Sequence, residues 1–204
     1  MPSRAAYPTP EHQTAANAIT DFFVSNYKID AVLLVNSCAR GKATRDSCLD
    51  IVMLAKPDPS RSSISALSAG WEEFEKSNQI LTNLYKVGKY SAVHPDFIDG
   101  VFIPQEQDEA AGPDDFELWI GNFLAYSVPL WQGSDYLEQL KRQWLPYYSD
   151  ELREQRLKMV RHYCLNNLRH IPPYIERGLY FQSFDRLYNA YREFLQALFI
   201  ARRT

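Results

Sequence analysis

Residues 36–51 read NSCARGKATRDSCLDI and lead from one short apolar run, residues 29–35, into a second, residues 48–54. Both runs are rich in aliphatic side chains, and short apolar runs bounded by small and polar residues are typical of buried strands. The connection contains Gly41 and several other small residues, which allow a tight turn. The segment therefore predicts two neighbouring strands in the core of a sheet. A strand–turn–strand without any chemistry is the simpler interpretation of the same residues.

The same segment resembles the signature of small nucleotidyltransferases of the DNA polymerase beta superfamily. That signature reads G-S-x-A-R-G-x-A-x-x-x-S-D-x-D and is followed by an apolar residue. The residues that match it in register are Ser37, Ala39, Arg40, Gly41, Ala43, Ser47 and Asp50. The close resemblance covers little more than this segment, and for the rest of the chain the similarity is one of arrangement.

The resemblance implies a nucleotide-binding turn after the first strand. In such a turn, backbone N–H groups and a helix N-terminus face the phosphates of the nucleotide. The hydroxyl of Ser37 adds a hydrogen-bond donor, and Arg40 adds a positive charge. The nucleotide-binding residues that the resemblance implies are Asn36, Ser37, Arg40 and Ser47.

The resemblance also implies Mg²⁺, held by carboxylates on two strands, where the ion bridges the triphosphate and activates the attacking hydroxyl. Side chains two apart on a strand share a face, so positions 48 and 50 share one. In the superfamily a third carboxylate comes from a later strand, and Asp96 and Asp99 are the acidic residues of the run 90–103. We favour Asp96, because Asp99 directly precedes Gly100 in a turn-like context. Asp50 and Asp96 are therefore the expected metal-binding and catalytic residues.

Two residues depart from the signature, and because of them the sequence does not decide whether the site is catalytically active. Asn36 stands where glycine is usual, and asparagine tolerates left-handed backbone geometry better than most residues. Cys48 stands where the first metal-binding aspartate is usual, and a neutral thiol is a poor ligand for Mg²⁺. Asp46, in the loop before the second strand, is a candidate substitute for the missing ligand. We expect Cys48 to be a buried small side chain rather than a nucleophile, and His94 to be a structural or partly exposed residue rather than a metal ligand.

The pattern around the two core strands predicts an α+β domain over residues 1–132, in which a small mixed sheet has flanking helices. Pro95 places the first part of the third strand at an edge, and Gly88 ends the helix before it. The elements expected besides the core strands are helices over residues 14–27, 64–84 and 118–122 and strands within residues 90–103 and 123–131.

A helical domain is expected over residues 133–204, as an antiparallel helical bundle. Helical spacing predicts helices over residues 134–147, 150–169 and 183–203, with Pro172 and Pro173 in the connection between the last two. The resemblance implies that the acceptor binds between the domains and that a carboxylate of the helical domain is the general base, for which Asp185 and Glu193 are the candidates. The helical spacing continues to Thr204 without a glycine or proline stop, so the sequence is compatible with a further segment after it.

Composition and charge argue against several classes of function. The chain has 204 residues, 46% of them hydrophobic, and a formal net charge of −3, so we expect a globular protein that binds no extended nucleic acid. Its apolar runs are too short for a membrane helix, and its N-terminus lacks a signal-peptide pattern, so we expect a cytoplasmic protein. Its three cysteines form no CxxC pair, which argues against a disulfide framework or a zinc knot.

The main hypothesis is transfer of a nucleoside monophosphate from an NTP, with ATP expected, to a hydroxyl of a small-molecule acceptor. The alternative is a catalytically degenerate relative that binds a nucleotide or a partner protein. A homodimer and one half of a toxin–antitoxin pair are further arrangements that the sequence leaves open. The acidic stretch of residues 106–117 is a candidate contact for a polycationic acceptor, although such charge runs are more often solvated loops.

Overall fold

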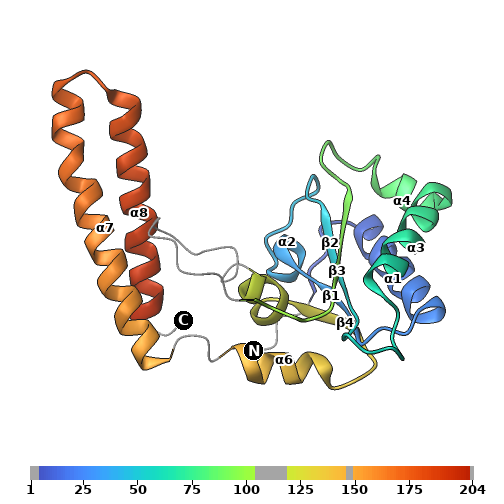
Figure 1. Cartoon of the computed structure of the whole chain (residues 1–204). Helices are drawn as coiled ribbons and strands as arrows, with labels where there is room; N and C mark the ends of the chain where they lie inside the picture. The colour runs from blue at the N-terminus through green and yellow to red at the C-terminus, as the bar shows by residue number, and fades with distance from the viewer. Residues whose placement is uncertain (1–4, 104–118, 146–148, 203–204) are drawn as a thin grey trace. The chain divides into compact units, whose positions relative to one another are not determined.

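The computed structural model describes residues 5–103, 119–145 and 149–202, which fall into two compact units (Figure 1). The first unit comprises residues 5–103 and 119–145, and the second comprises residues 149–202. The helix α6 (Tyr136–Trp144) belongs to the first unit, where it contacts the π-helix η1 (Ile120–Ala125). The division into domains over residues 1–132 and 133–204 stays a prediction.

The first unit is built on a four-stranded mixed sheet with the strand order β3-β2-β1-β4. The central strand β1 pairs antiparallel with β2 and with β4, whereas β2 and β3 pair parallel. The strands are β1 (Ala31–Leu34), β2 (Leu49–Leu54), β3 (Val93–Ile98) and β4 (Val128–Gln132). The predicted mixed sheet and its two buried neighbouring strands are confirmed, and Pro95 lies in the edge strand β3.

Helices cover the sheet and bury its central strands. Every residue of β1 and β2 is buried, which explains why both strands read as continuous apolar runs. Helix α1 (Pro10–Asn26) contributes Ala15, Ile19 and Phe23 to this core, at the four-residue spacing that lines one helix face. Figure 1 shows α1 together with α3 (Ile64–Ser77) and α4 (Gln79–Leu84) on one side of the sheet.

The single helix predicted over residues 64–84 is wrong, because the chain breaks between α3 and α4 at Asn78. The Asn78 backbone is extended, with φ −93° and ψ 112°. Its side-chain oxygen accepts hydrogen bonds from the backbone N–H groups of Ile80 at 2.9 Å and Leu81 at 3.3 Å. An asparagine that caps a new helix start competes with continuation of the previous helix, and the apolar periodicity does not register this.

The second unit is a hairpin of two long helices, α7 (Asp150–Glu176) and α8 (Tyr180–Arg202), which run antiparallel (Figure 1). The prediction that Pro172 and Pro173 lie in the connection is wrong, because both lie inside α7. The turn is set by Gly178, which has φ 70° and donates its N–H to the Ile175 carbonyl at 2.9 Å. The N–H of Leu179 reaches the Tyr174 carbonyl at 2.8 Å, so α7 ends in a Schellman motif that needs glycine.

Other predicted elements are present with shifted bounds. The short helix expected over residues 118–122 is the π-helix η1, and the strand expected over residues 123–131 is β4. The acidic stretch of residues 106–117 lies outside the described residues. In the described parts of the chain, we find no helix with enough length and apolar character to span a membrane.

Buried Asp30 fixes the start of β1. Its side chain has no exposed surface and accepts the backbone N–H of Lys56 at 2.9 Å, and it lies 3.0 Å from Nη2 of Arg61. The hydroxyl of Ser134 donates to the same carboxylate, and the N–H of Gly133 donates to the Asp30 carbonyl at 2.9 Å. Asp30 therefore links the segments that follow β2 and β4 to the start of β1.

We expect Asp30→Ala to destabilise the first unit by about 2–4 kcal/mol, because it removes a buried ion pair and leaves buried donors without an acceptor. Urea unfolding followed by tryptophan fluorescence measures the loss, since Trp71, Trp119, Trp131 and Trp144 all lie in this unit. Asp58→Ala, which removes a half-buried, solvent-accessible partner of Lys56, should leave the unfolding midpoint close to that of the parent protein. Equal midpoints for the two variants would contradict the anchoring role of Asp30.

Candidate functional site

The segment after β1 turns sharply at Asn36, whose φ of 54° lies in the left-handed region. Among the described residues, Asn36 is the only non-glycine residue with a positive φ. Glycine, which is usual at this position of the signature, adopts this conformation most easily, and asparagine tolerates it better than most residues. Asn36 therefore keeps the turn that the signature needs, and the short helix α2 (Asn36–Ala39) forms there.

Ser37 and Arg40 leave part of their side chains accessible on this turn, since Ser37 is half-buried and Arg40 is exposed. The N–H of Lys42 donates to the Ser37 carbonyl at 2.9 Å, which closes the turn through the backbone. Nε of Arg40 lies 3.4 Å from the Asn36 carbonyl, and the guanidinium carbon lies 5.8 Å from the ring centre of Tyr126. Both side chains are accessible to an anion, and their nucleotide-binding role stays a prediction.

Ser47 and Asp46 are engaged in the loop that leads into β2. The Ser47 hydroxyl accepts the N–H of Thr44 at 2.9 Å, and the Ser47 carbonyl lies 2.9 Å from Nε2 of His12. Oδ1 of Asp46 accepts the N–H of Lys89 at 3.2 Å and so anchors the loop that follows α4. These contacts give both residues a structural role, and nucleotide binding by Ser47 stays a prediction.

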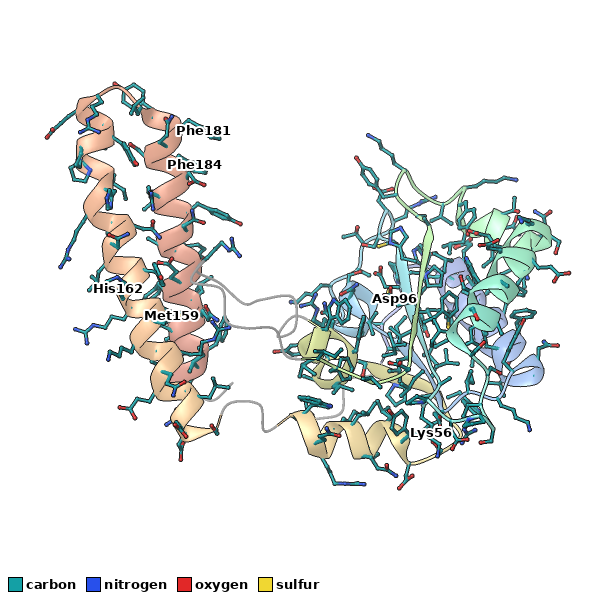
Figure 2. All side chains as sticks on the ribbon, viewed as in Figure 1. Lys56, Asp96, Met159, His162, Phe181 and Phe184 are labelled. Atoms are coloured by element: carbon teal, nitrogen blue, oxygen red, sulfur yellow. The ribbon has the colours of Figure 1, made fainter. Side chains whose placement is uncertain are left out.

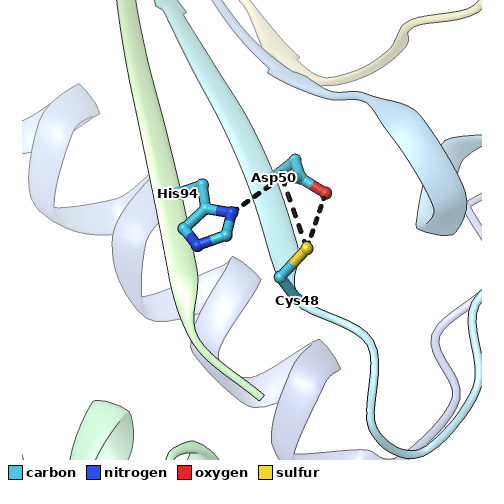
Figure 3. Close-up of side chains that lie close together, drawn as sticks. All are labelled: Cys48, Asp50 and His94. Atoms are coloured by element: carbon cyan, nitrogen blue, oxygen red, sulfur yellow. Dashed lines mark hydrogen bonds and ion pairs between the residues drawn. The ribbon is translucent and has the colours of Figure 1, made fainter. Parts of the chain in front are cut away.

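Cys48, Asp50 and His94 meet where β2 and β3 run side by side (Figure 3). Sγ of Cys48 lies 3.3 Å from Oδ2 of Asp50 and 3.5 Å from Oδ1, and Nδ1 of His94 lies 3.3 Å from Oδ1. Asp50 is only 6% exposed, whereas the His94 side chain is 64% exposed. His94 is thus exposed, but it also lies beside Asp50, which sequence reasoning did not reveal.

The parallel pairing of β2 with β3 explains this contact. Asp50 and His94 are Cα partners in the pairing, so their side chains leave the sheet on the same face. Cys48 is two residues before Asp50 and shares that face by alternation. The three ligand atoms lie within 4.8 Å of one another, so the three side chains are able to hold a metal ion.

The thiol of Cys48 is protonated at neutral pH. Burial, followed by the negative charge of Asp50 and the hydrogen bond to it, raises the pKa of Cys48 to about 11. Half-buried Cys48 therefore donates its S–H to the Asp50 carboxylate instead of acting as a thiolate nucleophile.

Asp96 lies on the same face of the sheet as Asp50. It is the Cα partner of Val52 and follows His94 by two residues on β3 (Figure 2 labels Asp96). Desolvation, followed by the negative charge of Asp50, raises the pKa of Asp96, while His94 acts in the opposite direction. The two carboxylates therefore influence each other, and their joint binding of a metal ion stays a prediction.

Asp99 has the turn role that was expected for it. Its Oδ1 accepts the N–H of Val101 at 2.9 Å, and Gly100 between them has φ 77°. A short polar side chain that accepts a backbone N–H two residues on is the usual device of such a turn. This local hydrogen bond explains Asp99 without a metal.

The two candidate general bases lie in the second unit and differ in burial. Asp185 is exposed and accepts Nδ2 of Asn189 at 3.3 Å. Glu193 has no exposed surface, and its Oε1 accepts Nδ2 of Asn167 at 3.0 Å. Nη1 of Arg186 donates to the oxygen of the same asparagine at 2.7 Å, so Glu193 belongs to a buried network within the hairpin. A role as general base stays a prediction for both.

Comparisons with known proteins leave the family of the chain undetermined. No family model matches it, and no curated protein matches it. Among solved structures, it is similar to a chain in a crystal structure of a toxin–antitoxin with AMP-PNP, at 16% identity and a TM-score of 0.44. That similarity covers 72% of this chain and 96% of the other. A similarity this weak carries no argument about the present chain.

We expect Asp50→Asn to speed the alkylation of Cys48 by iodoacetamide several-fold at mildly alkaline pH. The neutral amide removes the negative charge that holds the thiol proton, so the pKa of Cys48 falls and the thiolate fraction rises. The rate is followed by mass spectrometry of the peptide that contains Cys48. Asp46→Asn removes an exposed carboxylate of the same loop and should leave the rate unchanged. An unchanged rate in Asp50→Asn would show that Asp50 does not control this thiol.

We expect Glu193→Gln to stabilise the hairpin at neutral and alkaline pH. Burial raises the pKa of Glu193, so folding favours the protonated carboxyl, and this contribution to stability is lost as the pH rises through the raised pKa. Glutamine resembles the protonated form at every pH. Hydrogen exchange of residues 149–202 should be slower in the variant than in the parent, with a difference that shrinks at acidic pH. The control is Glu154→Gln, an exposed position on α7, and equal effects of both changes would refute the argument.

Proposed function

We propose that the first unit binds a nucleoside triphosphate, with ATP expected, and transfers its nucleoside monophosphate to a hydroxyl of a small molecule. The observation that carries the proposal is the position of Asp50 and Asp96 on one face of adjacent parallel strands. The turn at Asn36 begins beside the backbone of Asp50, because the N–H of Val35 donates to the Asp50 carbonyl at 3.1 Å. The small-molecule nature of the acceptor and the formation of a homodimer remain predictions.

The turn supplies groups that suit the phosphate end of the nucleotide. Ser37 offers a hydroxyl, and Arg40 offers a guanidinium at an exposed position that is held near the turn by Asn36 and Tyr126. A guanidinium binds phosphate oxygens through paired hydrogen bonds. In this proposal the two side chains orient the triphosphate, so that its α-phosphate faces the carboxylates of β2 and β3.

The proposed reaction is an in-line substitution at the α-phosphorus. The acceptor hydroxyl oxygen forms a bond to that phosphorus, the bond to the oxygen that bridges to the β-phosphate breaks, and pyrophosphate leaves. The hydroxyl proton passes to a carboxylate or to water. Catalysis of such a transfer consists mainly of positioning and of charge stabilisation, which is what the turn and the carboxylate face offer.

Mg²⁺ is the cofactor that the resemblance implies, and the residues fit it only in part. Asp50 and Asp96 offer the oxygen ligands that Mg²⁺ requires. The position of the first metal-binding aspartate in the signature holds the protonated thiol of Cys48, and the nearest nitrogen belongs to His94. Sulfur and imidazole nitrogen are poor donors for this ion, so we assign no step of the reaction to Mg²⁺.

A second candidate function is a nucleotide-binding protein of the same fold that does not turn over. The hydrogen bond from Cys48 to Asp50 favours it, because the thiol occupies a position that a metal-binding carboxylate has in the signature. In this case the turn would still hold the triphosphate. The two candidates differ only in whether a covalent product forms.

We expect ATP to bind the full chain, and Ser37→Ala to weaken that binding about tenfold, because a hydrogen bond to a charged phosphate is worth about 1.5–3 kcal/mol. Isothermal titration measures the affinity. Ser25→Ala, which removes an exposed hydroxyl on α1, is the matched control and should bind ATP as the parent does. Equal affinity in the parent and Ser37→Ala would refute the assignment of the phosphate contact.

Turnover is tested separately with ATP labelled at the α-phosphate and a panel of hydroxylated acceptors, including aminoglycosides. A labelled acceptor that is lost in Asp50→Asn supports nucleotidyl transfer. Binding of ATP without any labelled product favours the second candidate. If ATP does not bind under any of these conditions, both candidates are wrong.

A further inference from the structure

We propose that Cys48, Asp50 and His94 bind a transition-metal cation of the zinc type, with one coordination position open to solvent. This cation would lie at the same site as the proposed function. Any role of the ion in transfer rests on that function, whereas the binding itself does not. Three features of the cluster favour such an ion: the distances between the donor atoms, the chemical softness of those atoms and the charge of the surrounding face.

The distances from the Asp50 carboxylate to the other two donor atoms match a tetrahedral ion. In a tetrahedral zinc site with bonds of about 2.0–2.3 Å, neighbouring ligand atoms lie about 3.3–3.8 Å apart. Sγ of Cys48 lies 3.3 and 3.5 Å from the two carboxylate oxygens of Asp50, and Nδ1 of His94 lies 3.3 Å from Oδ1. All three donor atoms fall within 4.8 Å of one another, so a small cation reaches them with little movement.

The donor types select the class of cation. One sulfur, one imidazole nitrogen and one carboxylate oxygen form a set that zinc and cobalt accept, whereas Mg²⁺ prefers oxygen alone. Catalytic zinc sites commonly have three protein ligands and one open position. The exposed side of His94 gives solvent, or a phosphate oxygen of a bound nucleotide, access to that position.

The backbone holds these donors in place before any ion arrives. Asp50 and His94 are Cα partners across two paired strands, and Asp50 is almost completely buried. Leu49, which lies between Cys48 and Asp50 in the chain, donates its N–H to the Ala92 carbonyl at 2.8 Å. A site on paired strands is more rigid than one on loops, so little conformational entropy is lost on binding.

The charge of this face also favours a cation. Asp50 and Asp96 both lie on it, as the pairing of β2 with β3 shows, and two carboxylates on one face repel each other. Within the described parts of the chain, neither carboxylate forms an ion pair with a lysine or an arginine, and exposed His94 is the basic group beside Asp50. A divalent ion would supply the missing positive charge.

Binding changes the protonation of one group. The S–H bond of Cys48 breaks, its proton passes to solvent, and the sulfur lone pair forms the bond to the metal. The hydrogen bond from the thiol to Asp50 is thereby replaced by coordination of both groups to the same ion. No oxidant or reductant is needed.

The test is titration of the metal-free full chain with Co²⁺, followed by absorption spectroscopy. We expect one equivalent to bind, with the visible bands of a tetrahedral ion and a near-ultraviolet band from thiolate-to-cobalt charge transfer. Cys48→Ser should abolish the charge-transfer band, and His94→Gln should weaken binding at least about tenfold. Cys164→Ser and His162→Gln, which change a cysteine and a histidine of the second unit, are the matched controls and should keep both the band and the affinity.

A second variant keeps the test decisive if Cys48→Ser unfolds. Cys48→Asp should lower the affinity for Zn²⁺ and raise that for Mg²⁺, because it replaces sulfur with oxygen. Competition with a chromophoric chelator measures both affinities, and circular dichroism confirms folding. A cobalt spectrum without the charge-transfer band, or the same Zn²⁺ affinity in Cys48→Asp, would overturn the proposal and leave a hydrogen-bonded cluster only.

The metal proposal and the proposed function fail in different ways. If ATP binds but Co²⁺ gives no thiolate band, the metal site is wrong and the nucleotide site stands. If Co²⁺ binds with the expected spectrum and ATP does not bind, the metal site stands and the proposed function is wrong.

Discussion

The candidate site depends on β2, a strand that is hydrogen-bonded along both edges and buried along its whole length. Such a strand accepts almost only apolar side chains, because a buried ionised group costs several kcal/mol unless it is paired. Asp50 is the one acidic residue of β2, and it lies near the beginning of the strand with His94 and Cys48 against it. The polar cluster therefore forms where the buried core gives way to the surface.

The strands at the centre of the fold were predictable because their buried faces give continuous apolar runs, and the turn at Asn36 was predictable from its small residues. The break at Asn78 had a local signal, an asparagine cap, that apolar periodicity outweighed. The turn at Gly178 had a glycine as its signal, but Pro172 and Pro173 outweighed it in the prediction. The contact between His94 and Asp50 had no such signal. It depends on the register of two strands far apart in the chain, which local sequence does not encode.

The same register accounts for the chemistry. Parallel pairing puts His94 opposite Asp50 and leaves Asp96 two residues further along the same face. A carboxylate at position 48 would have completed a set of hard oxygen donors. With Cys48 there, the nearest donors around Asp50 are sulfur and nitrogen, a set that suits the zinc-type ion of the proposed site better than Mg²⁺. The turn at Asn36 does not involve residue 48, which is why the proposed nucleotide binding and the proposed metal preference are separate questions.

Zinc K-edge X-ray absorption of the protein loaded with one equivalent of Zn²⁺ tests the central claim most directly, because it reports the atoms bonded to the ion. The account predicts a first shell with one sulfur at about 2.3 Å and nitrogen or oxygen atoms at about 2.0–2.2 Å. The sulfur contribution should disappear in Cys48→Ser and persist in Cys164→Ser. A first shell of nitrogen and oxygen alone in the parent protein would contradict it.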